Sequence, residues 1–390
     1  MAASPWRHGM KLGLRKTVRF LSTVASVFCL ANVVQFVAAD CECGYSAVVD
    51  GHVQVFTDLI ETDFAHLLDI ATNTDWVRQA FNVTSEADRG SYGEMYAIDD
   101  MQTAVAPNSH IEDGQADDGQ PAGLRLLVQP GLVGDMIPVS EIDSSRTDIM
   151  YGSFRAGIRL TNVTGTCSAF FWYFNDTQEI DMEFLSREYN ASNRSYPVNL
   201  VLQSREAAES GFNAQGTPTF IKASLPFDPT TGLHEYRIDF LPGKVYFYAD
   251  GQLLANMAGD AVPTHAGHLV LQQWSNGNPL WSGGPPKEDA VTTVSYVKAY
   301  FNSSSSQRHK DWSIRCRNPT APGAVCAIPQ ATATNTTASG WFFTNQNNMT
   351  NNQTVSGHKN SGGRVVSVAA ALWTMSVVVF AAIGWELGIW

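Results

Sequence analysis

Residues 170–184 read Phe-Phe-Trp-Tyr-Phe-Asn-Asp-Thr-Gln-Glu-Ile-Asp-Met-Glu-Phe, and the second half of this stretch alternates acidic and apolar side chains. Successive side chains of an extended strand point to opposite faces of the sheet. We therefore expect a strand in which Glu179, Asp181 and Glu183 share one face, while the apolar residues between them point into a core.

Three carboxylates on one strand face repel one another, so the pattern needs a reason. A solvated outer strand would mix its acids with lysine or threonine. A structural calcium ion stays open as an alternative, although three carboxylates on one straight strand do not surround a cation alone. No cofactor is required by the pattern.

Catalysis explains the three acids better. Residues four apart on a strand lie ~13 Å apart at Cα, and inward-leaning side chains would leave the roughly 5–5.5 Å between carboxyls that retaining glycosidases use. We expect Glu179 to act as the nucleophile and Glu183 as the acid/base. Asp181 would share a hydrogen bond with Glu179.

Further strands surround this one and are separated by turn signals at 241–243 and 250–251. Few helical patterns interrupt them, which predicts an all-β sandwich of two packed antiparallel sheets, with one catalytic domain over 40–302. The alternating segments are 151–160, 236–240 and 244–249.

Both ends of the chain carry export patterns. Residues 1–19 are basic and are followed by an apolar run to Ala39, which predicts a signal peptide over 1–39, with an uncleaved anchor as the alternative. No basic residue follows the hydrophobic tail at 364–390, which favours a glycosylphosphatidylinositol (GPI) anchor signal over a membrane span. We expect a secreted protein held at the plasma membrane or the cell wall.

Residues 303–363 are rich in Ser, Thr and Asn, which predicts a glycosylated stalk, with an extension packed on the domain as far as Cys326 as the alternative. Nine Asn-x-Ser/Thr sequons agree with secretion. They lie at Asn82, Asn162, Asn175, Asn190, Asn193, Asn302, Asn335, Asn348 and Asn352.

The predicted mature chain keeps an odd number of cysteines, so one thiol should stay free or pair with another molecule. A Cys316–Cys326 disulfide would close a short loop and leave Cys41 or Cys43 available for Cys167, but the sequence leaves the connectivity open. The net charge of −12 argues against a nucleic-acid partner and is compatible with a neutral polysaccharide. We expect a monomer.

The spacing Glu-x-Asp-x-Glu at 179–183 resembles glycoside hydrolase family 16, in the compact form found in bacterial lichenases, plant xyloglucan transglycosylases and fungal chitin-glucan crosslinking enzymes. The likeness continues in order over 151–302, and it includes Tyr151-Gly-Ser-Phe, Leu233-His-Glu-Tyr236, Tyr248-Ala-Asp-Gly251 and Trp274-Ser-Asn-Gly277. The resemblance implies a concanavalin A-like β-jelly-roll of two curved antiparallel sheets and the same three catalytic roles.

The resemblance also implies contacts with a sugar chain, since aromatic faces pack on sugar rings and amides bond hydroxyls. Two residues depart from the family: Arg155 stands where an acid is usual and Gly157 where an arginine is usual, which predicts altered contacts near the nucleophile. The implied substrate-binding residues are Phe171, Tyr173, Asn199, Gln272 and Trp274.

Three functions fit these features. An endo-β-glucanase would cut β-1,3- or β-1,3/1,4-glucan, whereas a transglycosylase would pass the same intermediate to a glucan or chitin acceptor. A catalytically silent glucan-binding wall protein is the third, although such a protein gains nothing from three acids that repel one another.

Overall fold

The computed structural model of the protein describes residues 40–106, 115–211, 214–332, 336–346 and 349. The expected signal peptide at 1–39 and the expected hydrophobic tail at 364–390 both lie outside these residues. Among the helices that the structure describes, none has the length and apolar character needed to cross a membrane.

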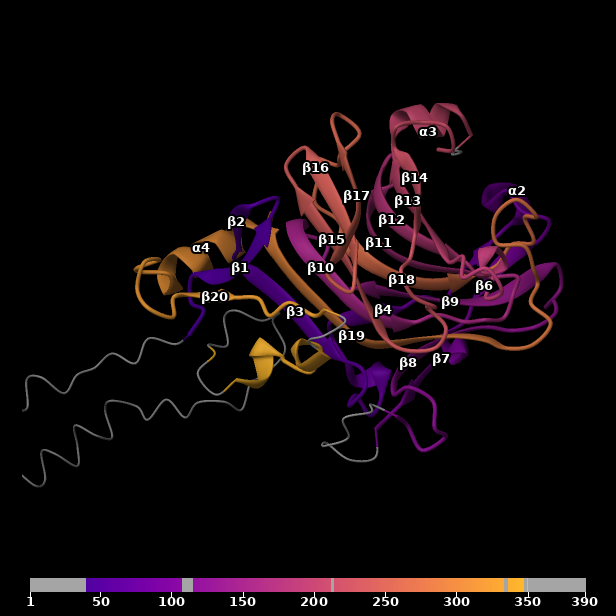
Figure 1. Cartoon of the computed structure of the whole chain (residues 1–390), viewed down its shortest axis with the longest axis horizontal. Coiled ribbons are helices and arrows are strands. Elements are labelled where there is room, and N and C mark those ends of the chain that lie inside the picture. The colour runs from indigo at the N-terminus through magenta and orange to yellow at the C-terminus, as the bar shows by residue number, and fades with distance from the viewer. Residues whose placement is uncertain (1–39, 107–114, 212–213, 333–335, 347–348, 350–390) are drawn as a thin grey trace, which may run out of the picture. The chain divides into compact units, whose positions relative to one another are not determined.

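The described residues form two large sheets that face each other (Figure 1). The first sheet contains the predicted acidic strand, and its order is β14-β13-β12-β11-β18-β9-β6-β5, with β4 also paired to β9. Its strands are β4 (Trp76–Arg78), β5 (Asn82–Val83), β6 (Gly93–Tyr96), β9 (Met136–Ser144), β11 (Cys167–Asn175), β12 (Gln178–Leu185), β13 (Pro197–Gln203), β14 (Phe220–Ser224) and β18 (His268–Trp274).

The second sheet has the order β17-β16-β15-β10-β19-β8-β7, with β3 also paired to β19. Its strands are β3 (Asp58–Asp63), β7 (Met101–Ala104), β8 (Gly123–Val128), β10 (Ile149–Arg159), β15 (His234–Leu241), β16 (Lys244–Ala249), β17 (Gln252–Ala258) and β19 (Ala290–Ser303). The predicted sandwich of antiparallel sheets is confirmed.

The described helices are short and lie in connections. The α-helices are α2 (Ser85–Asp88), α3 (Arg205–Glu209) and α4 (Ser306–Arg315). The 3-10 turns are η1 (Ile70–Thr72), η2 (Ile98–Asp100), η3 (Ser186–Glu188), η4 (Thr336–Ala338) and η5 (Phe343–Asn345).

Local sequence explains the three consecutive strands β15, β16 and β17. The turn between β16 and β17 places Asp250 at φ 46° and Gly251 at φ 76°, as the primed turns of two-residue hairpins require. This turn joins β16 to β17 in the register in which Val245 opposes Met257, so the apolar side chains of neighbouring strands meet on the core face.

The core lies between the apolar faces of the two sheets. The catalytic strand contributes Ile180, Met182 and Phe184, all at most 1% exposed. Trp172 on the neighbouring strand is fully buried, and its Nε1 donates to the carbonyl of Ile149 at 3.1 Å. The predicted alternation of β12 is therefore confirmed on its buried face.

The cysteines pair differently from the sequence prediction. The disulfides join Cys41 to Cys326 and Cys43 to Cys316, while Cys167 stays free and buried. A third small sheet explains this pairing: β1 (Gly44–Val49) lies between β2 (His52–Phe56) and β20 (Val325–Ala327), and it runs parallel to β20. The chain ends of the domain are thus adjacent in space although far apart in sequence.

The described part of the predicted stalk is folded against the domain, which corrects the sequence expectation for those residues. We call the described residues 328–332 and 336–346 the C-terminal strap. The ammonium group of Lys298 donates to the strap carbonyls of Ala338, Ser339 and Trp341 at 2.7–2.9 Å. Glu61 accepts from both the backbone N–H and the hydroxyl of Thr344.

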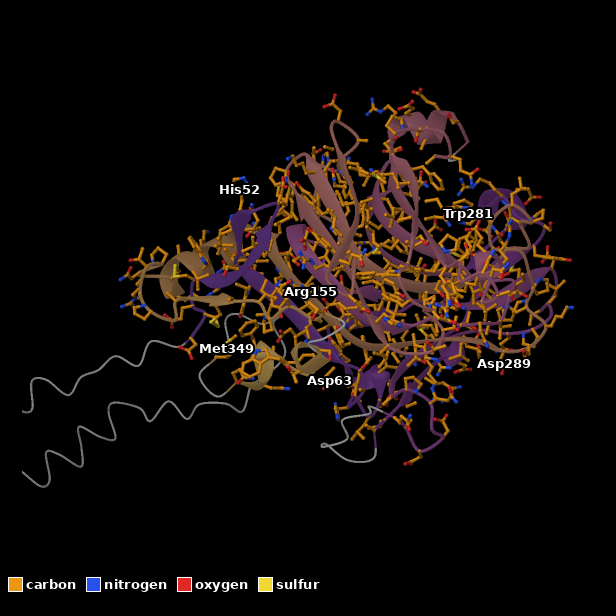
Figure 2. The ribbon with its side chains drawn as sticks, in the orientation of Figure 1. His52, Asp63, Arg155, Trp281, Asp289 and Met349 are labelled. Atoms are coloured by element: carbon orange, nitrogen blue, oxygen red, sulfur yellow. A yellow bond between two sulfur atoms is a disulfide. The ribbon has the colours of Figure 1, made fainter. Side chains whose placement is uncertain are left out.

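Arg155 also binds this strap, which overturns the prediction that it alters contacts near the nucleophile. It lies on β10 in the second sheet, and its Nη1 donates to the carbonyl of Pro329 at 2.8 Å. Figure 2 shows Arg155 apart from Trp281, which lines the cavity described below. The arginine therefore anchors the strap on the outer face of the sandwich.

Candidate active site

Strand β12 carries the three predicted acids between two neighbouring strands. Glu179, Asp181 and Glu183 face Tyr173, Phe171 and Ala169 on β11 and Gln203, Val201 and Asn199 on β13. Residues directly opposite one another in a sheet point to the same face. The predicted geometry is confirmed: the three carboxyls share the face that points away from the core.

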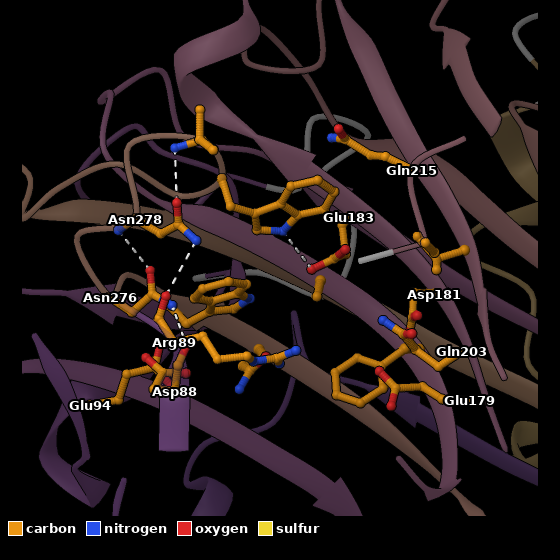
Figure 3. A pocket seen from close by; sticks show the side chains of 18 of the residues that line it. Asp88, Arg89, Glu94, Glu179, Asp181, Glu183, Gln203, Gln215, Asn276 and Asn278 are labelled. Carbon is orange, nitrogen blue, oxygen red and sulfur yellow. Dashed lines mark hydrogen bonds between the residues drawn. The ribbon is translucent and has the colours of Figure 1, made fainter. Parts of the chain in front are cut away.

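A cavity of about 370 Å³ lies over this face and is lined by all three acids (Figure 3). Figure 3 shows Glu179, Asp181 and Glu183 one after another, with Asp88, Glu94, Asn276 and Asn278 grouped beyond Arg89. The acids are therefore neither on opposite sides of the strand nor sealed from a ligand.

The three carboxyls have different proton affinities. Burial, opposed by a hydrogen bond from Asp181 and aided by the charge of Glu183, raises the pKa of Glu179 to about 7. Burial also raises the pKa of Asp181 well above its usual range, and the charge of Glu179 adds to this. At neutral pH Asp181 therefore keeps its proton and donates a hydrogen bond to Glu179.

Glu183 has its own surroundings. Burial raises its pKa to about 7, and hydrogen bonds from Trp281 and Cys167 together with the charge of Arg89 oppose the rise. A carboxyl that titrates near neutral pH is able both to donate and to accept a proton there. The site thus combines one carboxylate held by a neutral acid with a second group able to transfer a proton.

Residues 137–298 match the family described as Glycosyl hydrolases family 16. The match covers residues 137–298, and this part of the chain is therefore similar to glycoside hydrolase family 16. The chain is similar to the Congo red hypersensitive protein 1 of Saccharomyces cerevisiae, with 24% identity over 160 residues that cover 38% of this chain and 29% of the relative. It is also similar to a beta-glucanase of Paenibacillus polymyxa, with 28% identity over 139 residues, covering 34% and 52% of the two chains.

The chain thus spans about half or less of these two relatives. Among solved structures it is similar to a prokaryotic beta-1,3-1,4-glucanase (lichenase) from a mouse hindgut metagenome. That match has 17% identity and a TM-score of 0.46, and it covers 62% of this chain and 99% of the other.

Three of the five predicted substrate contacts line this cavity: Phe171, Gln272 and Trp274. Tyr173 is partly buried, and its hydroxyl donates to Asp176 at 2.7 Å. Asn199 is fully buried opposite Glu183, and neither of its amide atoms has a hydrogen-bond partner. Contacts of all five residues with a sugar stay predictions.

Sequence reasoning missed a polar network at the β9 and β6 side of the cavity. Gln272 Nε2 donates to the hydroxyl of Tyr96 at 2.5 Å and to Glu141 at 2.8 Å, and the Tyr96 hydroxyl donates to Glu94 at 2.6 Å. Burial raises the pKa of Glu141 to about 8. The alternation Glu141-Ile-Asp143 on β9 repeats the pattern of the catalytic strand and could have indicated Glu141, but not Glu94 or Tyr96 on β6.

A second missed group is the segment 275–284, between β18 and β19. Its Trp281 reaches Glu183, and Trp281 lies 6.3 Å from Phe220 of β14 between ring centroids. Together with Val201 these rings form an apolar surface on the β13–β14 side of the catalytic strand. Within the described residues, no group of three or more His, Cys, Asp and Glu side chains is arranged to hold a metal ion.

Proposed function

We propose that the chain is a retaining glycoside hydrolase that cleaves β-1,3- or β-1,3/1,4-glucan by double displacement. The observation that carries the proposal is that Glu179, Asp181 and Glu183 line one cavity and that neutral Asp181 is hydrogen-bonded to Glu179. The names of the matched beta-glucanases support the substrate class.

In the first step Glu179 forms a bond to the anomeric carbon as the bond from that carbon to the glycosidic oxygen breaks. Glu183 gives its proton to that oxygen, so the leaving sugar departs as an alcohol. In the second step Glu183, now a carboxylate, takes a proton from water, and the resulting oxygen displaces Glu179 from the sugar.

Asp181 supports both steps. Its hydrogen bond stabilises the charge of Glu179 before the attack and again as Glu179 leaves. Its own proton stays in place, because a second ionised carboxyl beside Glu179 would repel it.

Transfer to a sugar acceptor is the second candidate activity. The apolar surface of Val201, Phe220 and Trp281 favours it, because sugar rings pack on aromatic faces whereas water does not. A sugar hydroxyl would then replace water in the second step.

The experiment is to incubate the full chain with laminarin and lichenan, with and without a fluorescent oligosaccharide acceptor. Shorter products indicate hydrolysis, and labelled longer products indicate transfer. A 2-fluoro glucoside should leave a covalent adduct on Glu179 that mass spectrometry detects. Wild-type protein that forms neither products nor an adduct would refute the proposal.

We also propose that the protein is secreted and tethered by its C-terminal tail. The two disulfides support an extracellular site, since such bonds persist in oxidising compartments. Five sequon asparagines are exposed, which makes them accessible to glycosylation: Asn82, Asn162, Asn175, Asn190 and Asn193. Release of the protein from cells by a phospholipase that cuts GPI anchors tests the tether.

A further inference from the structure

One carboxyl oxygen of Glu183 receives two hydrogen-bond donors from different elements. The indole Nε1 of Trp281 lies 3.2 Å from Oε1 of Glu183. The thiol of Cys167, the first residue of β11, lies 3.7 Å from the same oxygen. An indole N–H only donates and a thiol donates weakly, so this oxygen is held as an acceptor.

The segment that carries Trp281 is held in place by a residue that lies just after the catalytic strand. Arg187 follows β12 directly, within η3. Its Nη1 donates to the carbonyls of Pro279 at 2.5 Å and Trp281 at 3.3 Å. The backbone N–H of Trp281 donates to the carbonyl of Asn278 at 3.0 Å. The indole therefore stays over Glu183 without a ligand.

The two donors determine which oxygen of Glu183 carries its proton. A proton on Oε1 would face the N–H of Trp281 and remove an acceptor from both donors. The proton therefore resides on Oε2. When Glu183 loses this proton, both donors remain to stabilise the new negative charge.

We propose that Trp281, assisted by Cys167, is a positioning residue that keeps the transferable proton of Glu183 on Oε2. This inference rests on the proposed function. During bond cleavage the Oε2 proton moves to the glycosidic oxygen, the bond between that oxygen and the anomeric carbon breaks, and Glu183 is left as a carboxylate that still accepts from Trp281. Arg89 and the neighbouring acids Asp181 and Glu179 are the other ionisable groups close to it.

The test compares two aryl glycosides of the same β-1,3-linked disaccharide. A 2,4-dinitrophenyl leaving group departs with little help from an acid, whereas a methylumbelliferyl group needs the proton. Trp281→Phe keeps an aromatic ring beside Phe220 and removes the N–H donor, together with part of the indole ring. It should lower kcat about tenfold on the methylumbelliferyl substrate and less than about twofold on the dinitrophenyl substrate.

The pH profile provides a second readout. A donor to the charged form lowers the pKa of Glu183, so its removal should move the alkaline limb of the profile to higher pH. Trp341→Phe is the matched control, because Trp341 is exposed and lies in the C-terminal strap. It should change neither readout.

Cys167 gives an independent pair of variants. Cys167→Ser keeps a donor and should retain the ratio of the two substrates, whereas Cys167→Ala should shift it in the same direction as Trp281→Phe. Equal losses on both substrates with an unmoved alkaline limb would show a merely structural role and overturn the inference. A wild-type protein that cleaves neither substrate nor glucan would overturn the proposed function as well.

Discussion

Asp181 donates a hydrogen bond to Glu179, and the two side chains lie on one face of β12. The donor is neutral because burial and the charge of Glu179 keep it protonated. Asparagine has the same shape and also donates, so Asp181→Asn should keep part of the activity, with a loss of about tenfold. Asp181→Ala removes the donor and should lose more, about a hundredfold.

Initial rates on lichenan and laminarin measure the difference between these variants. Val201→Ala serves as a size control, because Val201 faces Asp181 from β13 without a polar group. Equal losses in Asp181→Asn and Asp181→Ala would mean that hydrogen bonding by residue 181 is not what supports the nucleophile.

Both outer carboxyls should be essential for turnover. Glu179→Gln removes the nucleophile and Glu183→Gln removes the transferable proton, so each should lower kcat by several orders of magnitude with the fold retained. Azide is a small nucleophile that needs no general base, so it should restore product formation in a Glu183→Ala variant on a 2,4-dinitrophenyl glycoside. Near-normal rates in either glutamine variant would contradict the mechanism.

The pH dependence should be bell-shaped around neutrality. Activity requires Glu179 ionised and Glu183 protonated, and burial raises the pKa of each to about 7. Protonation of Glu179 therefore lowers kcat/KM as the pH falls, and ionisation of Glu183 lowers it as the pH rises. Because the two groups interact, the limbs report the pair rather than single residues. A rate that is flat from pH 5 to 9 would exclude this assignment.

The sequence predicted the parts of the site that lie on one strand. Alternation alone places Glu179 and Glu183 on the same face, since the geometry of a strand is local. Glu94, Tyr96 and Trp281 come from other segments, and their approach to the cavity depends on how the strands pair. No local pattern reports that pairing, so these residues became visible only in the structure.

The C-terminal end of the domain also could not be predicted from the sequence. The composition after Asn302 is that of a stalk, yet the described residues there pack on the second sheet through Lys298 and Arg155. The strap buries few apolar side chains, among them Phe342 and Phe343. These are enough to hold it on the sheet, because buried charged side chains of the sheet also bind its backbone. Composition indicates how much apolar surface a segment can bury, but it does not show which polar groups of the domain will bind its backbone.

The hydrogen bonds between Lys298 and the strap should contribute to the stability of the folded protein. Lys298→Met removes the donor of three carbonyls, those of Ala338, Ser339 and Trp341, and leaves these oxygens without their partner. Loss of a buried partner costs roughly 1–3 kcal/mol, so the unfolding midpoint should fall by several degrees. Lys244→Met is the control, because the Lys244 side chain is 53% exposed and its ion pair with Asp50 lies at the surface. Equal midpoints for the two variants would contradict the role of Lys298.

Replacing Glu141 by glutamine should stabilise the folded protein at high pH. Its ordinary pKa is 4.5, and burial raises it to about 8 in the folded protein. Between these values the folded state holds a proton that the unfolded chain has released, so the contribution of Glu141 to stability is lost as the pH rises. Glu141→Gln keeps an oxygen that accepts from Gln272 and cannot ionise. Thermal unfolding should therefore show little difference from wild type at pH 4 and a higher midpoint for the variant at pH 8, whereas a difference of equal size at both pH values would rule out titration of Glu141 as the cause.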